Sequence, residues 1–228
     1  MSKYTLVVRR TDYKANVIGE KGELIRKKWF DSGIDISHSL IKLEDSNGTR
    51  CYVHSNRGVL PRFLYANISE FGENGLAVVT AQNGKKNFID RQGNLICHTW
   101  YDDCTWLRCG VGIVKKGKYF NLIDKDDNLL YREWFKSITI LSPVGYIVSF
   151  NSVDLLLMEK KNGLYNIFNV NTKKMVFTKT LSSIEARHDY FKVKRTCDGF
   201  YNYMNMKGQV LHRRWVKPAQ VSIEELID

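Results

Sequence analysis

The residues best suited to chemistry are soft metal ligands in the middle of the chain: Cys97-His98, Cys104 and Cys109. Structural zinc sites favour ligand pairs about two to four residues apart, whereas six residues separate Cys97 from Cys104. Cysteines outside such patterns behave as small buried hydrophobic residues. We therefore expect no metal ion and no cofactor here.

A second candidate is Asp124-x-Asp126-x-Asn128, which begins like a calcium-binding loop. Such a loop needs a glycine where this chain has Leu129, and a bidentate glutamate where it has Phe135. Aspartate and asparagine are also favoured in turns, because their side chains bond the local backbone. The segment is therefore interpreted as a turn between two strands.

No familiar catalytic or nucleotide-binding motif occurs in the sequence. The GxGxxG, Walker-type GKS or GKT, GxSxG and HExxH patterns are all absent. The five histidines have no partner arrangement that suggests a general base. The adjacent Asp102 and Asp103 are interpreted as a strand end or turn. We expect a non-enzymatic protein without catalytic residues.

The clearest bias in the composition is an excess of positively charged residues. The chain has 35 Lys and Arg residues against 24 Asp and Glu residues, a formal net charge of +11. Most basic clusters fall beside recurring glycine turns, so repetition would align them along one edge. This candidate polyanion- or partner-binding edge consists of Arg9, Arg10, Lys85, Lys86, Lys115, Lys116, Lys118, Lys160, Lys161, Lys194 and Arg195.

Two interpretations of this basic edge stay open. A stripe of cations can bind a polyanion such as nucleic acid, with an affinity that falls steeply as salt rises. Lysines are also common at exposed sheet edges and turns, where they hinder aggregation. No base-reading motif accompanies the charges, which favours the second interpretation.

A repeat of about 35 residues positions these charges. In each copy we number positions from a reference residue, position 0, and most copies have a glycine at position +6, six residues later. The reference residue, position 0, is Asn16, Tyr52, Asn87, Asn121, Asn166 and Asn202 in repeats 1 to 6. The glycines at +6 are Gly22, Gly58, Gly93 and Gly208.

Four of the five tryptophans share position +13. One repeat cannot bury enough apolar surface alone, so neighbouring repeats must share a core, and large aromatic side chains fill such cores well. The four expected core residues are Trp29, Trp100, Trp134 and Trp215. Trp106 lies outside this position and is the candidate for an exposed contact with a partner.

Each repeat is expected to contain three strands. One starts near position 0, as in Asn87–Asp90, and a short run such as Asn94–Cys97 follows the glycine turn. A third run begins about 24 residues after position 0, as in Leu76–Val79 or Tyr146–Val148. It ends at a turn such as Asn83-Gly84, a strong hairpin signal, since type I′ turns need positive φ at both central residues.

The pattern Tyr/Phe-Asn-x-Ile-Asp-x-x-Gly-x-(Leu/Val)-(Leu/Ile), followed by Trp-(Phe/Tyr)-Asp, resembles the bacterial WG (KWG-type) repeat family. Its clearest matches span residues 87–102 and 120–135, and Trp29-Phe30-Asp31 supports repeat 1. Repeats 2 and 5 depart from it, because both lack the tryptophan and repeat 5 also lacks the glycine. The resemblance implies an all-β repeat array that serves as an interaction module in bacterial and phage proteins, without catalytic residues.

These observations predict an all-β fold, an array of six three-stranded antiparallel meanders. The array is either an open superhelix or a propeller-like ring, and the complete first and last meanders favour the open form. Residues 1–219 are expected to form a single β-repeat domain, with units that start near residues 4, 40, 76, 111, 146 and 190. Residues 220–228 are expected to form a short acidic C-terminal tail of helical composition.

Cellular location follows from three further features. No stretch approaches the roughly 18 apolar residues of a membrane helix, and the first residues lack the pattern of a secretory signal. The five cysteines lack the spacing of a disulfide framework, which indicates reduced thiols. We expect a cytoplasmic protein, or a virion-associated one if it is phage-encoded, with no membrane partner.

The function hypothesis is a non-enzymatic β-repeat module that binds another protein, as a scaffold, an adaptor or a virion component. The alternative is a nucleic-acid-associated protein that binds a polyanion through the basic edge. Binding to DNA or RNA at low and moderate salt would separate the two hypotheses.

Overall fold

The computed structural model describes residues 4–37, 40–48, 50–55, 58–59, 65–72, 74–142 and 154–217. Within these ranges the regular structure is β-strand, apart from a single 3₁₀ turn at Arg108–Gly110. No helix in the described residues is long and apolar enough to cross a membrane. The expected C-terminal tail, residues 220–228, lies outside the described residues. The chain is therefore all-β, built from small antiparallel sheets.

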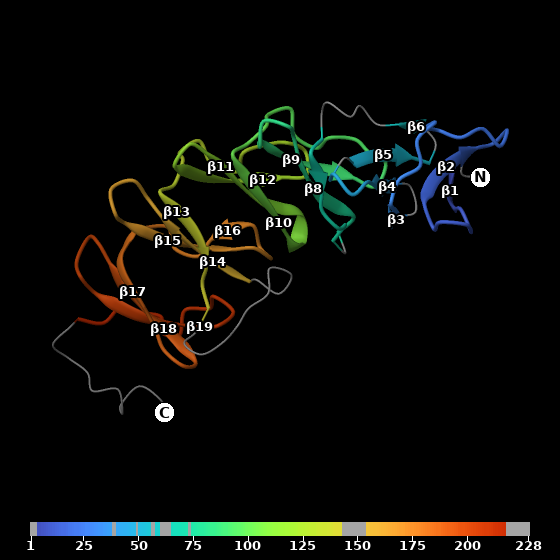
Figure 1. Cartoon of the computed structure of the whole chain (residues 1–228). Coiled ribbons are helices and arrows are strands. Elements are labelled where there is room, and N and C mark those ends of the chain that lie inside the picture. Colours follow the sequence, from blue (N-terminus) through green and yellow to red (C-terminus); the bar gives the residue numbers. More distant parts are fainter. Residues whose placement is uncertain are drawn as a thin grey trace. The chain divides into compact units, whose positions relative to one another are not determined.

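The chain divides into two compact units, Met1–Trp106 and Leu107–Asp228. In the first unit the described strands form three sheets, ordered β1-β2, β3-β4-β5-β6 and β7-β8-β9 (Figure 1). Their bounds are β1 Tyr4–Val8, β2 Ala15–Gly19, β3 Ser32–Ser37, β4 Leu40–Glu44, β5 Arg50–His54, β6 Gly58–Val59, β7 Asn67–Ile68, β8 Leu76–Thr80 and β9 Lys86–Asp90.

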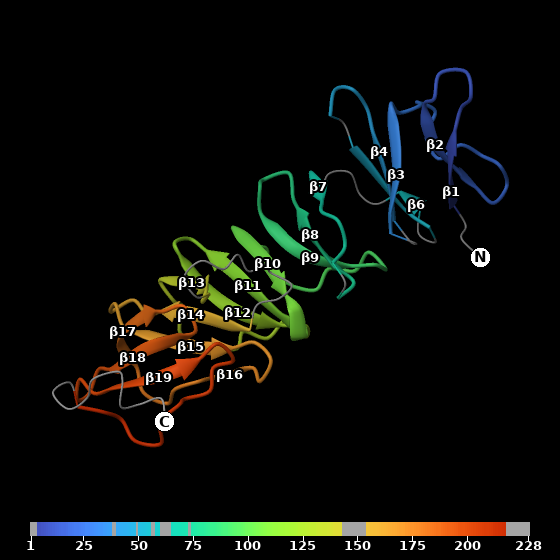
Figure 2. The ribbon, with the colours of Figure 1, turned by 90° about the horizontal axis from the view of Figure 1, so that it is seen from below.

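Two further sheets are described, ordered β10-β11-β12 and β13-β14-β15-β17-β18-β19, with β16 paired to β15. Figure 2 shows β17, β18 and β19 side by side, as this order requires. The strands are β10 Asp103–Leu107, β11 Val111–Lys116, β12 Tyr119–Asp124, β13 Ser137–Ile140, β14 Leu155–Glu159, β15 Tyr165–Asn169, β16 Lys174–Met175, β17 Leu181–Ala186, β18 Tyr190–Arg195 and β19 Tyr201–Asn205.

Each meander begins one strand earlier than the sequence pattern predicts. The strand after each position +13 pairs with the predicted third run, which pairs with the position 0 strand, as in β7-β8-β9. The run after the glycine turn forms isolated bridges in four repeats, such as Ile89↔Leu95. The extra strand escaped the pattern because its residues are of mixed polarity, as in Ser32-Gly33-Ile34-Asp35.

The predicted third run of the fourth unit, Tyr146–Val148, lies outside the described residues. The strand that leads into the Asn162-Gly163 turn is β14, and it pairs with both β13 and β15. The interval of 45 residues between Asn121 and Asn166 is therefore filled by an insertion between β13 and β14.

The turns before position 0 are set by glycines with positive φ. In repeat 3, Gly84 adopts a φ of 81°, and the Asn83 side chain accepts a hydrogen bond from the Lys85 amide at 3.1 Å. Equivalent glycines are Gly48 and Gly163, with φ of 73° and 79°. Because a side chain makes this conformation costly, these glycines fix where each hairpin reverses.

The core is divided into clusters that neighbouring repeats share. Val17 and Phe30 of repeat 1 pack with Leu43 and Val53, which flank the turn of repeat 2. In the second unit Phe135 and Phe168 lie in one cluster although they belong to repeats 4 and 5. Each fully buried side chain of this size contributes about 1.5–3 kcal/mol, so each repeat depends on its neighbour for stability.

Candidate functional site

The reference asparagine of the repeat fixes the loop that carries the tryptophan. Asn87 is fully buried, and its Nδ2 donates to the carbonyl oxygens of Cys97, at 2.7 Å, and Thr99, at 3.4 Å. Its Oδ1 accepts from the Phe88 amide at 2.7 Å. One buried side chain thus joins the position 0 strand to the residues before position +13.

The same arrangement recurs along the chain. The Nδ2 of Asn16 donates to the carbonyl oxygens of Arg26, at 2.8 Å, and Lys28, at 3.2 Å. The Nδ2 of Asn121 donates to Tyr131 and Glu133 at 2.8 and 3.2 Å. We call residues 26–30, 97–101, 131–135 and 212–216, at positions +10 to +14, the tryptophan loops.

Repeat 2 has Tyr52 in place of the asparagine, and this side chain makes a different hydrogen bond. The Tyr52 hydroxyl accepts a hydrogen bond from the Ile68 amide at 2.9 Å. Burial raises the pKa of this phenol. The hydroxyl therefore stays neutral and holds a different segment from the one an asparagine would hold.

The tryptophans are half-buried, and in repeats 1, 3 and 4 the next residue is the more buried of the two. Trp100 and Trp215 also pack against core clusters. Trp134 is intermediate in exposure whereas Phe135 is fully buried. Phe30 and Tyr101 are likewise buried, at 5% and 4% exposure. Successive residues of an extended segment point to opposite sides, so only one of each pair can face the core. Trp29, Trp100, Trp134 and Trp215 are all half-buried.

Trp106, the candidate for an exposed contact, is also half-buried. Its ring packs edge-on against Phe88, with centroids 4.8 Å apart. Its Nε1 is buried and has no hydrogen-bond partner among the described residues. The structure therefore gives Trp106 a packing contact inside the first unit and not an open face.

Five of the eleven cations on the predicted basic edge are held in ion pairs. The Lys86 Nζ lies 2.7 Å from Asp103 Oδ1, and the Lys160 Nζ lies 2.8 Å from Glu133 Oε1. The other three pairs are Arg9–Asp12, Lys85–Asp102 and Arg195–Asp198. The edge is therefore less available to a polyanion than the charge count indicates.

Two of these arginines also cover a tryptophan. The guanidinium carbon of Arg9 lies 4.7 Å from the ring centroid of Trp29, and that of Arg195 lies 4.5 Å from Trp215. Such cation–π contacts contribute about 0.5–1 kcal/mol at exposed sites. In repeats 1 and 6 the arginine thus closes one face of the tryptophan ring.

The remaining edge cations gather partly on aromatic rings in the second unit. The Nζ atoms of Lys161 and Lys118 lie 4.2 and 5.5 Å from the ring centroid of Tyr119. Lys115 Nζ lies 5.5 Å from the ring of Phe120. The exposed cations are Arg10, Lys116, Lys118, Lys161 and Lys194.

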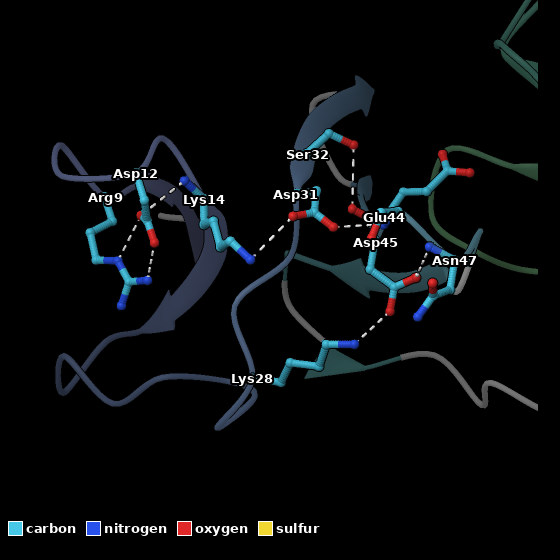
Figure 3. A network of polar contacts seen from close by, with 10 residues as sticks. Arg9, Asp12, Lys14, Lys28, Asp31, Ser32, Glu44, Asp45 and Asn47 are labelled. Atoms are coloured by element: carbon cyan, nitrogen blue, oxygen red, sulfur yellow. Dashed lines mark hydrogen bonds and ion pairs between the residues drawn. The ribbon is translucent and has the colours of Figure 1, made fainter.

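A cavity of about 260 Å³ lies in the first unit where the tryptophan loop of repeat 1 meets the hairpin turn of repeat 2. Lys28 Nζ reaches across to Asp45 Oδ2 at 2.6 Å, and Asp45 Oδ1 accepts from the Asn47 amide at 3.1 Å (Figure 3). The cavity is lined by Arg26, Lys27, Lys28, Phe30, Asp45, Asn47, Arg50 and Cys51.

Asp31 ties the same two segments together beside this cavity. Its Oδ2 accepts from the Ser46 amide at 2.6 Å, and its Oδ1 lies 3.2 Å from Lys14 Nζ (Figure 3). These partners, the backbone amide first, hold the pKa of Asp31 below its ordinary value. The carboxylate therefore stays charged and links repeat 1 to the turn of repeat 2.

The second unit has a cavity of about 350 Å³ at the equivalent place, between the tryptophan loop of repeat 4 and the turn of repeat 5. An ion pair again bridges it, between Glu133 and Lys160. The cavity is lined by Arg132, Glu133, Trp134, Lys160, Lys161 and Asn162. We call these two cavities the junction pockets.

Sequence reasoning singled out three residues of the second junction pocket, Lys160 and Lys161 as edge cations and Trp134 as a core residue, but it predicted neither pocket. The pockets join residues separated by an entire strand pair, so no local pattern reveals them. One signal was present: position +11 is basic or histidine in four repeats, and all four side chains are exposed. These residues are Lys27, His98, Arg132 and Arg213.

The described residues contain no group of three or more His, Cys, Asp or Glu side chains that could hold a metal ion. Cys97 and Cys104 are buried, whereas Cys109 is exposed. Burial raises the pKa of the Cys104 thiol to about 12. This thiol is thus a neutral, packed group at physiological pH.

No protein-family model and no curated protein sequence matches the chain with significance. Among solved structures, BamB from Moraxella catarrhalis is 12% identical with a TM-score of 0.32, over 92% of this chain and 70% of that one. The computationally designed Ika8 protein is 14% identical with a TM-score of 0.34, over 97% and 78% of the two chains. The WD40 β-propeller domain of Doa1 is 12% identical with a TM-score of 0.28, over 79% and 66%. With scores this low, the function is argued from the chain's own residues.

Proposed function

We propose that the protein is a non-enzymatic β-repeat module that binds another protein, as a scaffold, an adaptor or a structural component of a virion. The observation that carries this proposal is the junction pocket, which is found in both compact units where the loop near position +12 of one repeat meets the hairpin turn of the next. Each pocket combines an aromatic side chain, Phe30 or Trp134, with surplus cations. Aromatic and arginine side chains are the residues enriched in protein–protein interfaces.

The proposal extends to family and place. The spacing of asparagine, glycine and tryptophan supports membership of the WG-type repeats, whose arrays serve as interaction modules. The partner would then be met in the cytoplasm, or in a virion if the chain is phage-encoded. Repetition supports this proposal because stacked repeats present an extended surface with the same chemistry at regular positions.

Nucleic acid is the competing partner, and Tyr119 is the observation that favours it. Bases stack on aromatic rings beside cations in many single-strand binding proteins. Here, however, Lys161 and Lys118 already lie over the Tyr119 ring. A base would have to displace them, whereas a protein partner can use the lysines where they stand. We therefore favour a protein partner.

The test is affinity capture from the organism that encodes the chain, with nuclease added to half of the sample. We expect a protein that is enriched by the wild-type chain and retained after nuclease treatment. Arg132→Glu/Lys161→Glu should lose it, because both changes reverse charge at the second junction pocket. Lys125→Glu/Lys207→Glu, two exposed lysines with the same total charge change, should retain it. Capture that disappears with nuclease would favour nucleic acid.

A further inference from the structure

We propose, building on the protein-binding function above, that the junction pockets are carboxylate sites. Each would take an Asp or Glu side chain from an acidic segment of the partner protein. The ligand is thus an extended peptide with intermittent negative charge.

The first step is the charge balance of the second junction pocket. Glu133 is already paired with Lys160. Among the described residues, neither Arg132 nor Lys161 takes part in an ion pair, and both are exposed. The pocket therefore has two cations available and one carboxylate that is already neutralised. An additional carboxylate from outside would complete it.

The cations of this pocket supply hydrogen-bond donors suited to a carboxylate. The planar guanidinium of Arg132 can form two parallel hydrogen bonds to one carboxylate. Lys161 is placed beside it by its contact with the Tyr119 ring. The Asn162 Oδ1 already accepts from the Leu164 amide at 3.2 Å, which leaves its NH₂ group as a donor. Trp134 supplies an apolar wall for the methylene groups of the ligand.

The first junction pocket has the same charge balance as the second. In its bridging ion pair, however, the cation and the acid have exchanged places between loop and turn. There the loop supplies the cation, Lys28, and the turn supplies the acid, Asp45. Arg26 and Lys27 take part in no ion pair among the described residues and are exposed. Both pockets therefore have one ion pair between loop and turn and two surplus cations, and in the first pocket Arg50 is paired with Glu44.

The fourth step separates a peptide from a nucleic acid. A single strand carries a phosphate at every nucleotide and gains affinity from many neutralised phosphates. Each junction pocket offers only two surplus cations, which can neutralise few of the phosphates that a nucleic-acid strand carries. A peptide can place one carboxylate at the pocket and uncharged residues beside the acid. The charge pattern thus fits an acidic peptide better.

The experiment uses the full chain and a fluorescein-labelled peptide of about 12 residues in which Glu and Ser alternate. Its counterpart has Gln in place of every Glu, and binding is measured by fluorescence anisotropy at about 50 mM salt, where charge contributes strongly. We expect the Glu peptide to bind at least about tenfold more tightly than the Gln peptide, in line with a charge-assisted hydrogen-bonded pair. Equal binding of both peptides would overturn the inference.

Variants locate the binding. In a chain that carries Arg26→Glu/Lys27→Glu, which removes the first pocket, Arg132→Glu/Lys161→Glu should weaken binding of the Glu peptide about tenfold. In the same chain, the neutral pair Arg132→Gln/Lys161→Gln should weaken it by about half that factor on a logarithmic scale. The matched control Lys125→Glu/Lys207→Glu should stay within about twofold of wild type. Circular dichroism confirms that each variant folds. An equal loss in the control would show non-specific attraction by net charge and would overturn the inference.

A third set of measurements distinguishes a failure of this inference from a failure of the proposed function. If the chain captures a protein partner but does not bind the Glu peptide, the protein-binding function stands and the carboxylate inference fails. If a single-stranded oligonucleotide of equal charge binds more tightly than the Glu peptide and competes with it, both fail. If the Glu peptide binds and the oligonucleotide does not displace it, both are supported.

Discussion

At the scale of single residues, the molecule depends on buried asparagines more than on its tryptophans. The Asn87 side chain donates to two carbonyl groups and accepts from two backbone amides, those of Phe88 and Cys97. A buried donor or acceptor that loses its partner costs about 1–3 kcal/mol. The tryptophan is half-exposed and closes the outer side of a loop that the asparagine has already fixed. In the repeat signature, the buried asparagine thus holds the loop, and the half-exposed tryptophan lies on that loop.

Replacing Asn87 with alanine should lower the free energy of unfolding by about 2–3 kcal/mol, because the carbonyl groups of Cys97 and Thr99 lose their donor inside the protein. Urea unfolding followed by circular dichroism measures this loss. Asn83→Ala, which removes an exposed turn asparagine, should cost at most about 1 kcal/mol. Equal losses in both variants would contradict the role given to Asn87.

Thiol reactivity should follow burial. Cys109 and Cys197 are exposed, whereas Cys51, Cys97 and Cys104 are buried, and the Cys104 thiol has its pKa raised to about 12. Since the thiolate is the reactive form, Ellman's reagent at about pH 8 should modify two thiols rapidly in the native protein. All five should react in denaturant. Rapid modification of Cys104 in the native protein would show that its site opens readily.

At the scale of elements, the turns and the loops between them carry most of the specificity. Hairpin turns reverse at glycines with positive φ, and the tryptophan loops of repeats 1 and 4 lie against the next turn through ion pairs. At the junction of repeats 5 and 6, the Thr196 hydroxyl donates a hydrogen bond to the Thr180 carbonyl oxygen at 3.1 Å. Neighbouring repeats therefore meet through a small set of interchangeable contacts.

Gly22 tests the turn at position +6 without a steric complication. Its φ is 78°, and a Cβ added there would meet nothing within 4 Å. Gly22→Ala should therefore cost about 1 kcal/mol of stability from backbone conformation alone. Gly22→Asn should cost less, since asparagine tolerates this region better. Thermal unfolding of the two variants compares them, and a larger loss for Asn would contradict the conformational explanation.

Acid should weaken the junction of repeats 1 and 2 through Asp31. The Ser46 amide and Lys14 hold the pKa of this carboxyl below its usual value, and the Arg9 pair lowers the pKa of Asp12 to about 2. A carboxyl whose pKa is lowered by folding contributes stability above its unfolded pKa and loses it as the pH falls through the folded value. Stability should therefore decrease between about pH 4 and pH 2.

The measurement is the melting temperature at pH values from about 6 to about 2. Asp31→Asn should melt at a lower temperature than wild type near pH 6, and the difference should shrink toward pH 2, where the wild-type carboxyl becomes protonated. Asp126→Asn, at an exposed turn position, serves as the control and should follow the wild-type curve. A constant difference across the range would assign the loss to something other than charge.

At the scale of the whole molecule, the net charge of +11 overstates what a partner meets. Five of the eleven predicted edge cations are neutralised within the chain, which leaves six without an ion pair among the described residues. If DNA binds along this edge, the logarithm of the binding constant should fall with the logarithm of salt concentration with a slope of at most about 5, since each phosphate contact contributes about 0.9. Filter binding at several salt concentrations measures it, and a slope near 10 would contradict this account.

Much of the fold was predictable because its signals are local. The asparagine, the glycine turns and the position 0 strands recur with the period and were located correctly, as at Asn87–Asp90 in β9. The strand after each tryptophan was missed because one of its faces is exposed and its residues are mixed. The junction pockets were missed because pairs such as Lys28–Asp45 join residues that only folding brings together.

The exchanged signs of the two bridging pairs have a consequence for how a chain of similar repeats avoids folding incorrectly. Repeats that resemble one another can dock on the wrong neighbour while the chain collapses. If the loop of repeat 1 met the turn of repeat 5, Lys28 would face Lys160. The opposite exchange would place Glu133 beside Asp45. Both errors bring like charges together. Electrostatic repulsion therefore disfavours the exchange of these two junctions and favours docking of each repeat on its own neighbour.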